Sequence, residues 1–160
     1  MDTDRIEKKI LLRAKQSRVW EALTDSTQFG LWFGAKLEGP FRAGATIRGA
    51  IAPSTDPETG KTSPYDGMPM EWVIDRIEPQ RLFSFRWHPH AIERGADYSS
   101  EPMTLVTFTL EETGEGVLLT VTESGFDGIP LARRALAIKS NERGWAIQVE
   151  RIGRYVARAS

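Results

Sequence analysis

The sequence predicts an α+β fold in which a curved antiparallel sheet of about six or seven strands packs against one long C-terminal helix. Residues 130–159 carry an amphipathic pattern that begins at Pro130, a residue suited to a first helical turn. Strand patterns follow one another through the middle of the chain, and their short connections leave no room for the crossovers of parallel pairing. Two short helical segments separate the first strand pattern from the rest.

The N-terminal segment is expected to form one strand and two short helices. Residues 5–13 alternate apolar and charged side chains, which is the pattern of a strand with one buried face. Ser17 suits the N-cap of a helix that ends near Asp25. Ser26 or Thr27 is expected to cap a second short helix over residues 28–33, which Gly34 closes. Two short helices at this place would plug one end of a curved sheet.

Strand patterns occupy most of the middle of the chain. Residues 35–52 hold two of them, separated by a turn that contains Gly and Pro. The others are expected at Met70–Ile77, Arg81–Trp87, Met103–Glu111 and Val117–Ser124. Two long segments, residues 53–69 and 88–102, interrupt this order, and we interpret them as lids, mobile insertions or dimer contacts.

The predicted C-terminal helix would bury one face against the sheet. Its apolar side consists of Leu131, Ile138, Trp145, Val149, Ile152 and Val156. Arg134, Asn141 and Gln148 follow one another at intervals of seven along one edge of that face, as either a solvated margin or the polar lining of a cavity. Leu136 and Ile147 point to the opposite side, which either a partner surface or a helix that starts later than Pro130 would explain. The sequence leaves both a monomer and a homodimer open.

Composition and charge exclude several classes of protein. A chain of 160 residues suits a single domain over residues 1–160. The formal net charge of -1, with acids and bases interleaved, gives no electrostatic basis for binding nucleic acid or an anionic membrane. The lack of cysteine removes disulfides and thiolate chemistry. Because there is no apolar signal region and no run of membrane-spanning length, we expect a cytoplasmic protein that does not insert into membranes.

Few residues indicate a metal, a cofactor or a catalytic group. The only histidines, His88 and His90, lack the further ligands that a metal site needs. The sequence has no Gly-x-Ser-x-Gly elbow and no glycine-rich phosphate loop. We therefore expect no metal, no cofactor and no catalytic residue. An enzyme would have to take its acid or base from Glu71, Asp75 and Glu123.

The better candidates are side chains expected to face the space between the sheet and the helix. A few polar groups among aromatic rings are the usual lining of a small-molecule pocket, where rings supply contact area and polar groups fix orientation. The alternative is that the tryptophans fill the core and the charged residues pair or face solvent, because sequence does not fix strand phase. The candidate ligand-binding residues are Trp32, Trp72, Arg86, Trp87, Glu123, Arg134, Asn141, Trp145 and Gln148.

Several stretches, taken in order, resemble a known family. They are residues 18–25 (RVWEALTD) with 32–34 (WFG), 73–87 (VIDRIEPQRLFSFRW), 106–110 (VTFTL) with 119–126 (LTVTESGF), and 141–145 (NERGW). In this order the chain resembles the START-like (SRPBCC) domains related to the activator of heat-shock-protein-90 ATPase, in their stand-alone bacterial form.

This resemblance implies a helix-grip fold, also called START-like or Bet v 1-like, in which a curved antiparallel sheet holds the C-terminal helix. The superfamily includes lipid and hormone binders, polyketide cyclases and co-chaperone domains, so the fold alone does not choose a function. The eukaryotic co-chaperones carry a separate N-terminal domain, which we do not expect in a chain that begins directly with strand one.

The residues and the resemblance together leave three hypotheses for function. The first is non-catalytic binding of a small apolar or amphipathic ligand in a cavity between the sheet and the C-terminal helix. The second is a protein-interaction role, similar to that of the co-chaperones, on heat-shock protein 90. The third is a cyclase- or hydrolase-like enzyme, which the superfamily allows but which nothing in the sequence demands.

Overall fold

The computed structural model describes residues 5–52, 59–60, 67–89 and 100–158. Its elements are β1 (Arg5–Leu12), α1 (Gln16–Thr24), α2 (Ser26–Phe33), β2 (Ala35–Leu37), β3 (Thr46–Ile51), β4 (Pro69–Glu78), β5 (Leu82–Trp87), β6 (Thr104–Thr113), β7 (Gly116–Ser124), the 3₁₀ turn η1 (Phe126–Gly128) and α3 (Leu131–Arg158). Most of the two segments predicted at 53–69 and 88–102 falls outside the described residues, so their roles stay predictions.

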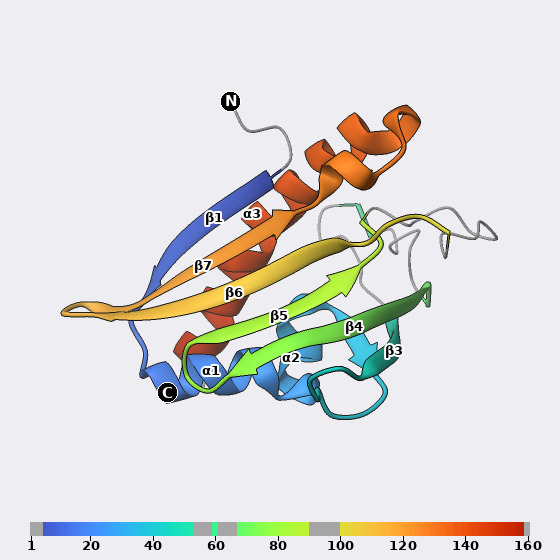
Figure 1. Ribbon diagram of the computed structural model, residues 1–160. Helices are drawn as coiled ribbons and strands as arrows, with labels where there is room; N and C mark the ends of the chain where they lie inside the picture. Colours follow the sequence, from blue (N-terminus) through green and yellow to red (C-terminus); the bar gives the residue numbers. More distant parts are fainter. Residues whose placement is uncertain (1–4, 53–58, 61–66, 90–99, 159–160) are drawn as a thin grey trace.

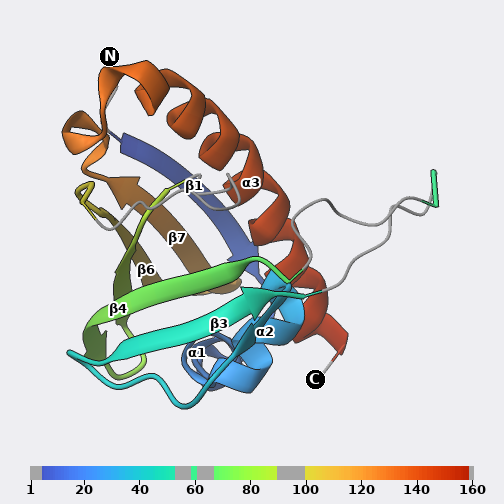
Figure 2. The same ribbon diagram turned by 90° about the vertical axis from the view of Figure 1, so that its right-hand side faces the viewer.

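The strands form one antiparallel sheet in the order β1-β7-β6-β5-β4-β3-β2. Consecutive strands from β2 to β7 are neighbours, and β1 pairs with β7, which places the first strand beside the last. The sheet curves around α3, which lies behind it in Figure 1 and runs obliquely alongside β1 in Figure 2. The shorter helices α1 and α2 lie together at one end of the sheet (Figure 1). This architecture confirms the predicted helix-grip fold.

Alternation along the strands decides which side chains face α3. β7 buries every second residue from Val117, so Glu123 lies on the same face as the apolar residues of that strand. β6 buries every second residue from Thr104 in the same way. Phe85 and Trp87 of β5 face this side, and Arg86 between them therefore faces the other.

A cluster of aromatic rings fills the curve of the sheet. Phe29 of α2 is fully buried at its centre, with its ring centroid 4.5 Å from that of Trp32, 5.4 Å from that of Trp72 and 6.0 Å from that of Phe108. Burying one large aromatic side chain of this kind stabilises a fold by roughly 1.5–3 kcal/mol. The position of α2, and of Phe33 at its end, is therefore fixed by core packing.

The caps of the short helices differ in part from the prediction. Lys15, not Ser17, is the N-cap of α1, because the helix begins one residue before the expected cap and Ser17 lies inside it. Asp25 ends α1 and, in place of the expected Ser26 or Thr27, caps α2, where its carboxylate accepts hydrogen bonds from two backbone N–H groups at 3.0 and 3.2 Å. Gly34 ends α2 in the left-handed conformation with φ of 92°, as predicted.

The long helix α3 turns most of the expected face toward the sheet, with Ile138 and Val149 only partly buried and Leu131 exposed. Its fully buried residues are Ala137, Trp145, Ile152 and Val156. Leu131, predicted on that face, is 79% exposed, because the start of α3 projects past the end of β7 (Figure 1). Leu136 and Ile147 point away from the sheet and are 57% and 51% exposed. Among the described residues, none of the helices combines the length and the apolar character that crossing a membrane requires.

Candidate functional site

A buried carboxylate lies at the interface between the sheet and α3. Glu123, near the end of β7, has no exposed surface. Its Oε1 accepts hydrogen bonds from Trp145 Nε1 at 2.8 Å and from Asn141 Nδ2 at 2.9 Å. Its Oε2 accepts from Trp87 Nε1 at 2.8 Å and from Thr104 Oγ1 at 2.6 Å, and Asn141 Nδ2 also lies 3.1 Å away. The carboxylate therefore joins β5, β6, β7 and α3.

The donors around Glu123 are all uncharged. No ion pair within the described part of the chain includes this residue. An ionised carboxylate only accepts hydrogen bonds, so the ionised form satisfies every one of these donors at once. A buried charge is tolerated when such bonds replace its hydration. We conclude that Glu123 fastens α3 to the sheet and holds two indole rings in fixed orientations.

Those two indoles pack against each other and against Phe33 where α3 meets the sheet. The ring centroids of Trp87 and Trp145 are 5.7 Å apart, and Phe33 lies 6.0 Å from the first and 6.1 Å from the second. Trp145 is buried, whereas Trp87 and Phe33 are only partly buried. Ile138, one turn before Asn141 on the same side of α3, is also partly buried. We use the name aromatic groove for the four residues Phe33, Trp87, Ile138 and Trp145, which lie along the interface of the sheet, α2 and α3.

The polar row on α3 makes contacts inside the protein along its whole length. Arg134 donates to the carbonyl oxygens of Ile129 at 3.0 Å and Asp127 at 2.7 Å, just before the helix begins. Gln148 Nε2 donates to the carbonyl oxygen of Phe33 at 3.0 Å. The Oε1 atom of Gln148 is buried and has no hydrogen-bond partner among the described residues. The central and last residues of this row therefore bond to groups inside the protein, and the polar lining of a cavity stays a prediction.

Comparison with known proteins identifies the family of this chain. The family described as Activator of Hsp90 ATPase homolog 1-like protein matches residues 13–157. The chain belongs to this family. No protein of curated function matches it. The helix-grip fold of the family typically binds hydrophobic ligands.

Solved structures share the fold of this family member. A Mesorhizobium loti protein is 19% identical with a TM-score of 0.72, and the match covers 98% of each chain. An Arthrobacter aurescens protein is 20% identical with a TM-score of 0.73, covering 99% of this chain and 90% of the other. DynU16, a protein of the dynemicin biosynthetic locus, is 27% identical with a TM-score of 0.70. The match covers 98% of this chain but only 48% of DynU16.

Two of the candidate tryptophans belong to the core of this family member and not to the edge of the groove. Trp32 is buried and donates through Nε1 to the carbonyl oxygen of Ala22 at 2.9 Å. Trp72 is buried beneath the groove, with its ring centroid 5.6 Å from that of Trp87. The structure thus brings together Trp87, Glu123, Asn141 and Trp145, with Gln148 beside them.

The expectation that Arg86 faces the groove is wrong. Neighbouring residues in a strand point to opposite faces, and Trp87 already faces α3. Arg86 instead donates to Asp75 at 2.7 Å on the outer face, where Ser84 donates to the same carboxylate at 2.9 Å. Burial acts to raise the pKa of Asp75, but these two hydrogen bonds and the charges of Arg86 and Arg76 outweigh it and lower that pKa below its ordinary value.

The three acids considered for catalysis lie in different surroundings. Glu71 is exposed and forms an ion pair with Arg48 at 3.4 Å. Asp75 lies on the outer face, and only Glu123 lies against the groove.

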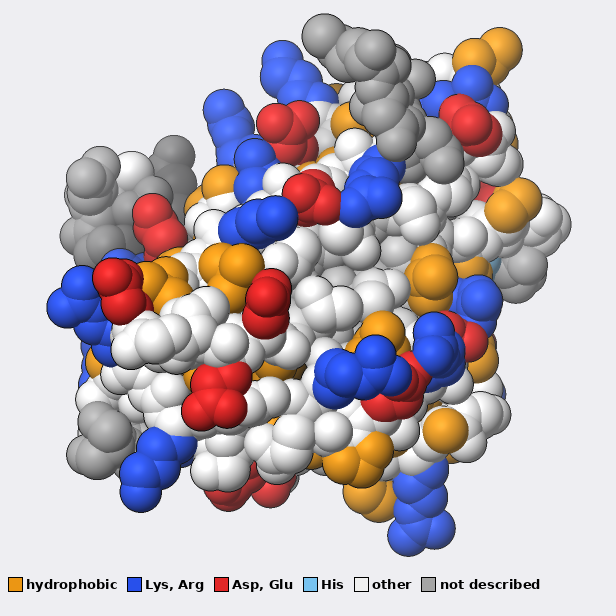
Figure 3. All heavy atoms as spheres, turned by 60° about the vertical axis from the view of Figure 1, so that its left-hand side comes forward, with side chains coloured by type: hydrophobic (Ala, Val, Ile, Leu, Met, Phe, Trp, Pro, Cys, Tyr) orange, Lys and Arg blue, Asp and Glu red, His pale blue; other side chains and the backbone are white. Residues whose placement is uncertain are grey.

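Acidic and basic side chains are interspersed on the face shown in Figure 3. His90 lies outside the described residues, within which no group of three potential metal ligands occurs.

Sequence reasoning missed Thr104 and did not place Phe33 in the site. Thr104 is in phase with the buried apolar residues of β6, so a polar residue at this inward position was a usable signal. Phe33 ends α2 beside α3, where its ring contacts those of Trp87 and Trp145. No pattern in the sequence indicates these ring contacts.

Proposed function

We propose that this protein binds a small apolar or amphipathic molecule in the aromatic groove between the sheet and α3, without catalysis. The observation that carries the proposal is the partial exposure of Phe33, Trp87 and Ile138 beside a carboxylate that fixes the neighbouring indoles. Rings held in place before binding lose little freedom when a ligand arrives. Partly exposed rings also offer the apolar area on which such a ligand depends.

The polar contacts of the ligand would come from amide oxygens and not from Glu123. Both carboxylate oxygens already accept several hydrogen bonds, so a ligand would have to displace one of them. Among the described residues, the buried Oε1 atom of Gln148 has no hydrogen-bond donor, so it could accept a hydrogen bond from the ligand. We therefore expect an apolar ligand that carries a hydroxyl or N–H group. The presence of DynU16 in a biosynthetic locus supports a small-molecule ligand.

A neutral probe tests the groove directly. N-phenyl-1-naphthylamine is apolar, carries one N–H and has no charge, so its fluorescence would report binding without attraction to surface arginines. We expect saturable binding to the wild-type protein and a Kd about fivefold weaker for Ile138→Ser, which corresponds to about 1 kcal/mol of lost apolar contact.

Ile147→Ser is the matched control, because Ile147 lies on the same helix but points away from the sheet and is 51% exposed. The proposal fails if the probe does not bind saturably, or if the two serine variants change its affinity equally. If the proposal holds, native mass spectrometry of the protein from its own host, under gentle and denaturing conditions, would give the mass of the natural ligand.

A protein-interaction role is the second candidate, and the exposed face of α3 favours it. Leu136 and Ile147 both point away from the sheet. If this face contacts heat-shock protein 90, the wild-type protein should be retained by the immobilised chaperone and should change its ATPase rate, and Ile147→Ser should weaken both effects. Absence of both effects in the wild-type protein would count against this role.

A further inference from the structure

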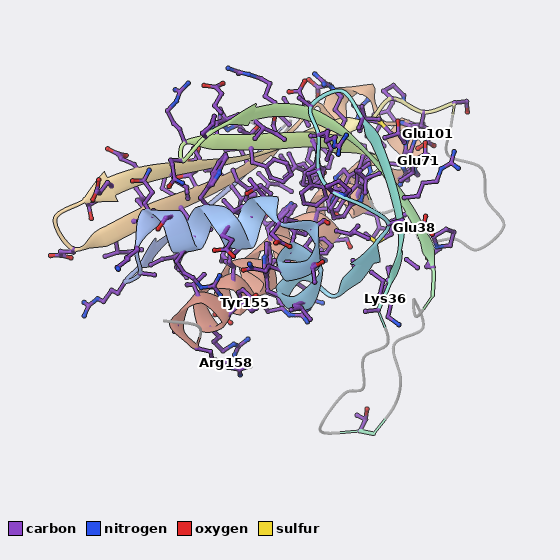
Figure 4. The ribbon with its side chains drawn as sticks, turned by 90° about the horizontal axis from the view of Figure 1, so that it is seen from below. Lys36, Glu38, Glu71, Glu101, Tyr155 and Arg158 are labelled. Carbon is purple, nitrogen blue, oxygen red and sulfur yellow. The ribbon has the colours of Figure 1, made fainter. Side chains whose placement is uncertain are left out.

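A hollow lies between α2 and the C-terminal end of α3. It encloses about 300 Å³ and is open to solvent. Its lining residues are Leu31, Trp32, Arg151, Arg154, Tyr155 and Arg158. Figure 4 shows Tyr155 and Arg158 together at this end of the molecule, while Glu38, Glu71 and Glu101 lie on the other side. The lining therefore contains three guanidinium groups and no acid.

Within the part of the chain that the structure describes, these arginines, Arg151, Arg154 and Arg158, form no ion pair with an acid. A fourth cation, Arg18, contacts a lining residue of the hollow, since its guanidinium lies 4.7 Å from the centre of the Tyr155 ring. The result is a local excess of positive charge on a protein whose formal net charge is -1.

Helix electrostatics alone account for only part of this cluster. Basic residues in a last helical turn are favoured by the helix dipole, which explains Arg158. Arg151 lies further back and is partly buried, donating to the carbonyl oxygen of Phe33 at 3.4 Å. Burial and the charge of Arg154 lower the pKa of Arg151. Burial and a second cation therefore both disfavour the charged form of Arg151. The attraction of a bound anion would offset both effects.

We propose that this hollow binds an oxyanion, a phosphate or carboxylate group, between the guanidinium groups of Arg151, Arg154 and Arg158. Guanidinium presents N–H donors in a fixed fork that matches the oxygens of phosphate and carboxylate. Leu31, which is 66% exposed at the edge of the hollow, gives an apolar surface for the rest of such a molecule. The oxyanion comes either from a free small molecule or from a lipid headgroup.

Inorganic phosphate is the probe for the first source. At constant ionic strength it should shift the arginine Nε–Hε signals of Arg151 and Arg154 and the indole signal of Trp32 along a saturable curve. The double variant Arg154→Gln, Arg158→Gln should weaken the Kd at least about tenfold, since two charge-assisted contacts are lost. Lys139→Gln, Arg143→Gln is the control, because it removes the same charge from exposed positions of the same helix.

Vesicles distinguish the second source. Sedimentation with phosphatidylcholine vesicles that contain phosphatidate, compared with pure phosphatidylcholine, should retain the wild-type protein if the oxyanion belongs to a lipid, and the double variant should lose that retention. Binding in either experiment that the control variant keeps and the double variant loses supports the site, whereas binding that the double variant keeps in full overturns it. The inference is overturned if neither phosphate nor phosphatidate binds, or if the control variant loses as much affinity as the double variant.

Discussion

Asn141 on α3 donates through Nδ2 to both carboxylate oxygens of Glu123 on β7, at 2.9 and 3.1 Å. Together with the indole of Trp145 one turn later, this amide ties the long helix to the sheet at a point where neither partner carries a positive charge. The same carboxylate orients Trp87 from β5. The position of α3 and the orientations of Trp87 and Trp145 therefore depend in part on one buried side chain.

Glu123→Gln should destabilise the protein by about 2–4 kcal/mol, because the new amide group would direct N–H donors at surrounding donors and leave some of them unpaired. Urea unfolding followed by circular dichroism would measure this loss. Glu150→Gln removes the same charge from an exposed position on α3 and should change stability by less than about 0.5 kcal/mol. Equal stability of the two variants would contradict the role given to Glu123.

Asp75 should make stability depend on pH in the acidic range. Its pKa is lowered from 3.8 because the hydrogen bonds from Arg86 and Ser84 and the charges of Arg86 and Arg76 outweigh the opposing effect of burial. A depressed pKa in the folded state stabilises the fold above the unfolded value and loses that contribution as pH falls through the folded value. Wild-type protein should therefore be more stable than Asp75→Asn at neutral pH.

That difference should shrink as the pH drops below 3.8, since the protonated carboxyl then resembles the amide. Urea unfolding of both proteins across this range gives the measurement. Glu112→Gln, at an exposed position near the end of β6, controls for the general loss of negative charge. A difference between wild type and Asp75→Asn that stays constant with pH would show that Asp75 acts through packing alone.

The longer elements of the fold could be predicted because they carry periodic patterns. The face of α3 that holds Trp145 and Ile152 follows from helical spacing, and the hairpins follow from alternation between turns. Glu123 could be selected as a candidate because it stands in an otherwise apolar row of β7. These inferences need only local sequence, which is why they agree with the structure.

The convergence on Glu123 could not be predicted in the same way. It depends on the register of β5, β6 and β7 and on the rotation of α3, which brings Asn141 over the end of β7. Arg86 was misplaced because a strand pattern does not state which of two neighbouring side chains faces inward. Leu131 was misplaced because periodicity does not show where the sheet stops covering the helix.

Gly144→Ala should stabilise the protein by about 0.5–1 kcal/mol, the usual difference between these residues in a helix interior. A glycine inside a helix indicates either a bend or close approach of another backbone, but a Cβ atom here would meet nothing within 4 Å. Close approach is therefore not the reason for this glycine. Thermal and urea unfolding would measure the gain. A loss of stability would show that the helix needs the flexibility of glycine at this point.

Gly30→Ala should have the opposite effect, although Gly30 also lies inside a helix. A Cβ atom at this position would stand 2.3 Å from the carbonyl oxygen of Ala35, well inside van der Waals contact. Ala35 is fixed by its pairing with Ile51 in the sheet, so α2 or the edge strand β2 would have to move. Overpacking of this kind costs about 1–3 kcal/mol, which urea unfolding would detect.

The change should also reach the groove, because Phe33 ends the helix that would shift. We expect Gly30→Ala to weaken binding of N-phenyl-1-naphthylamine, while Gly144→Ala, the same substitution on α3, leaves it unchanged. If Gly30→Ala retained full stability, the contact between α2 and β2 would be looser than the structure indicates. If it lost stability but bound the probe normally, α2 would not position the groove, and Phe33 would have to be removed from the proposed site.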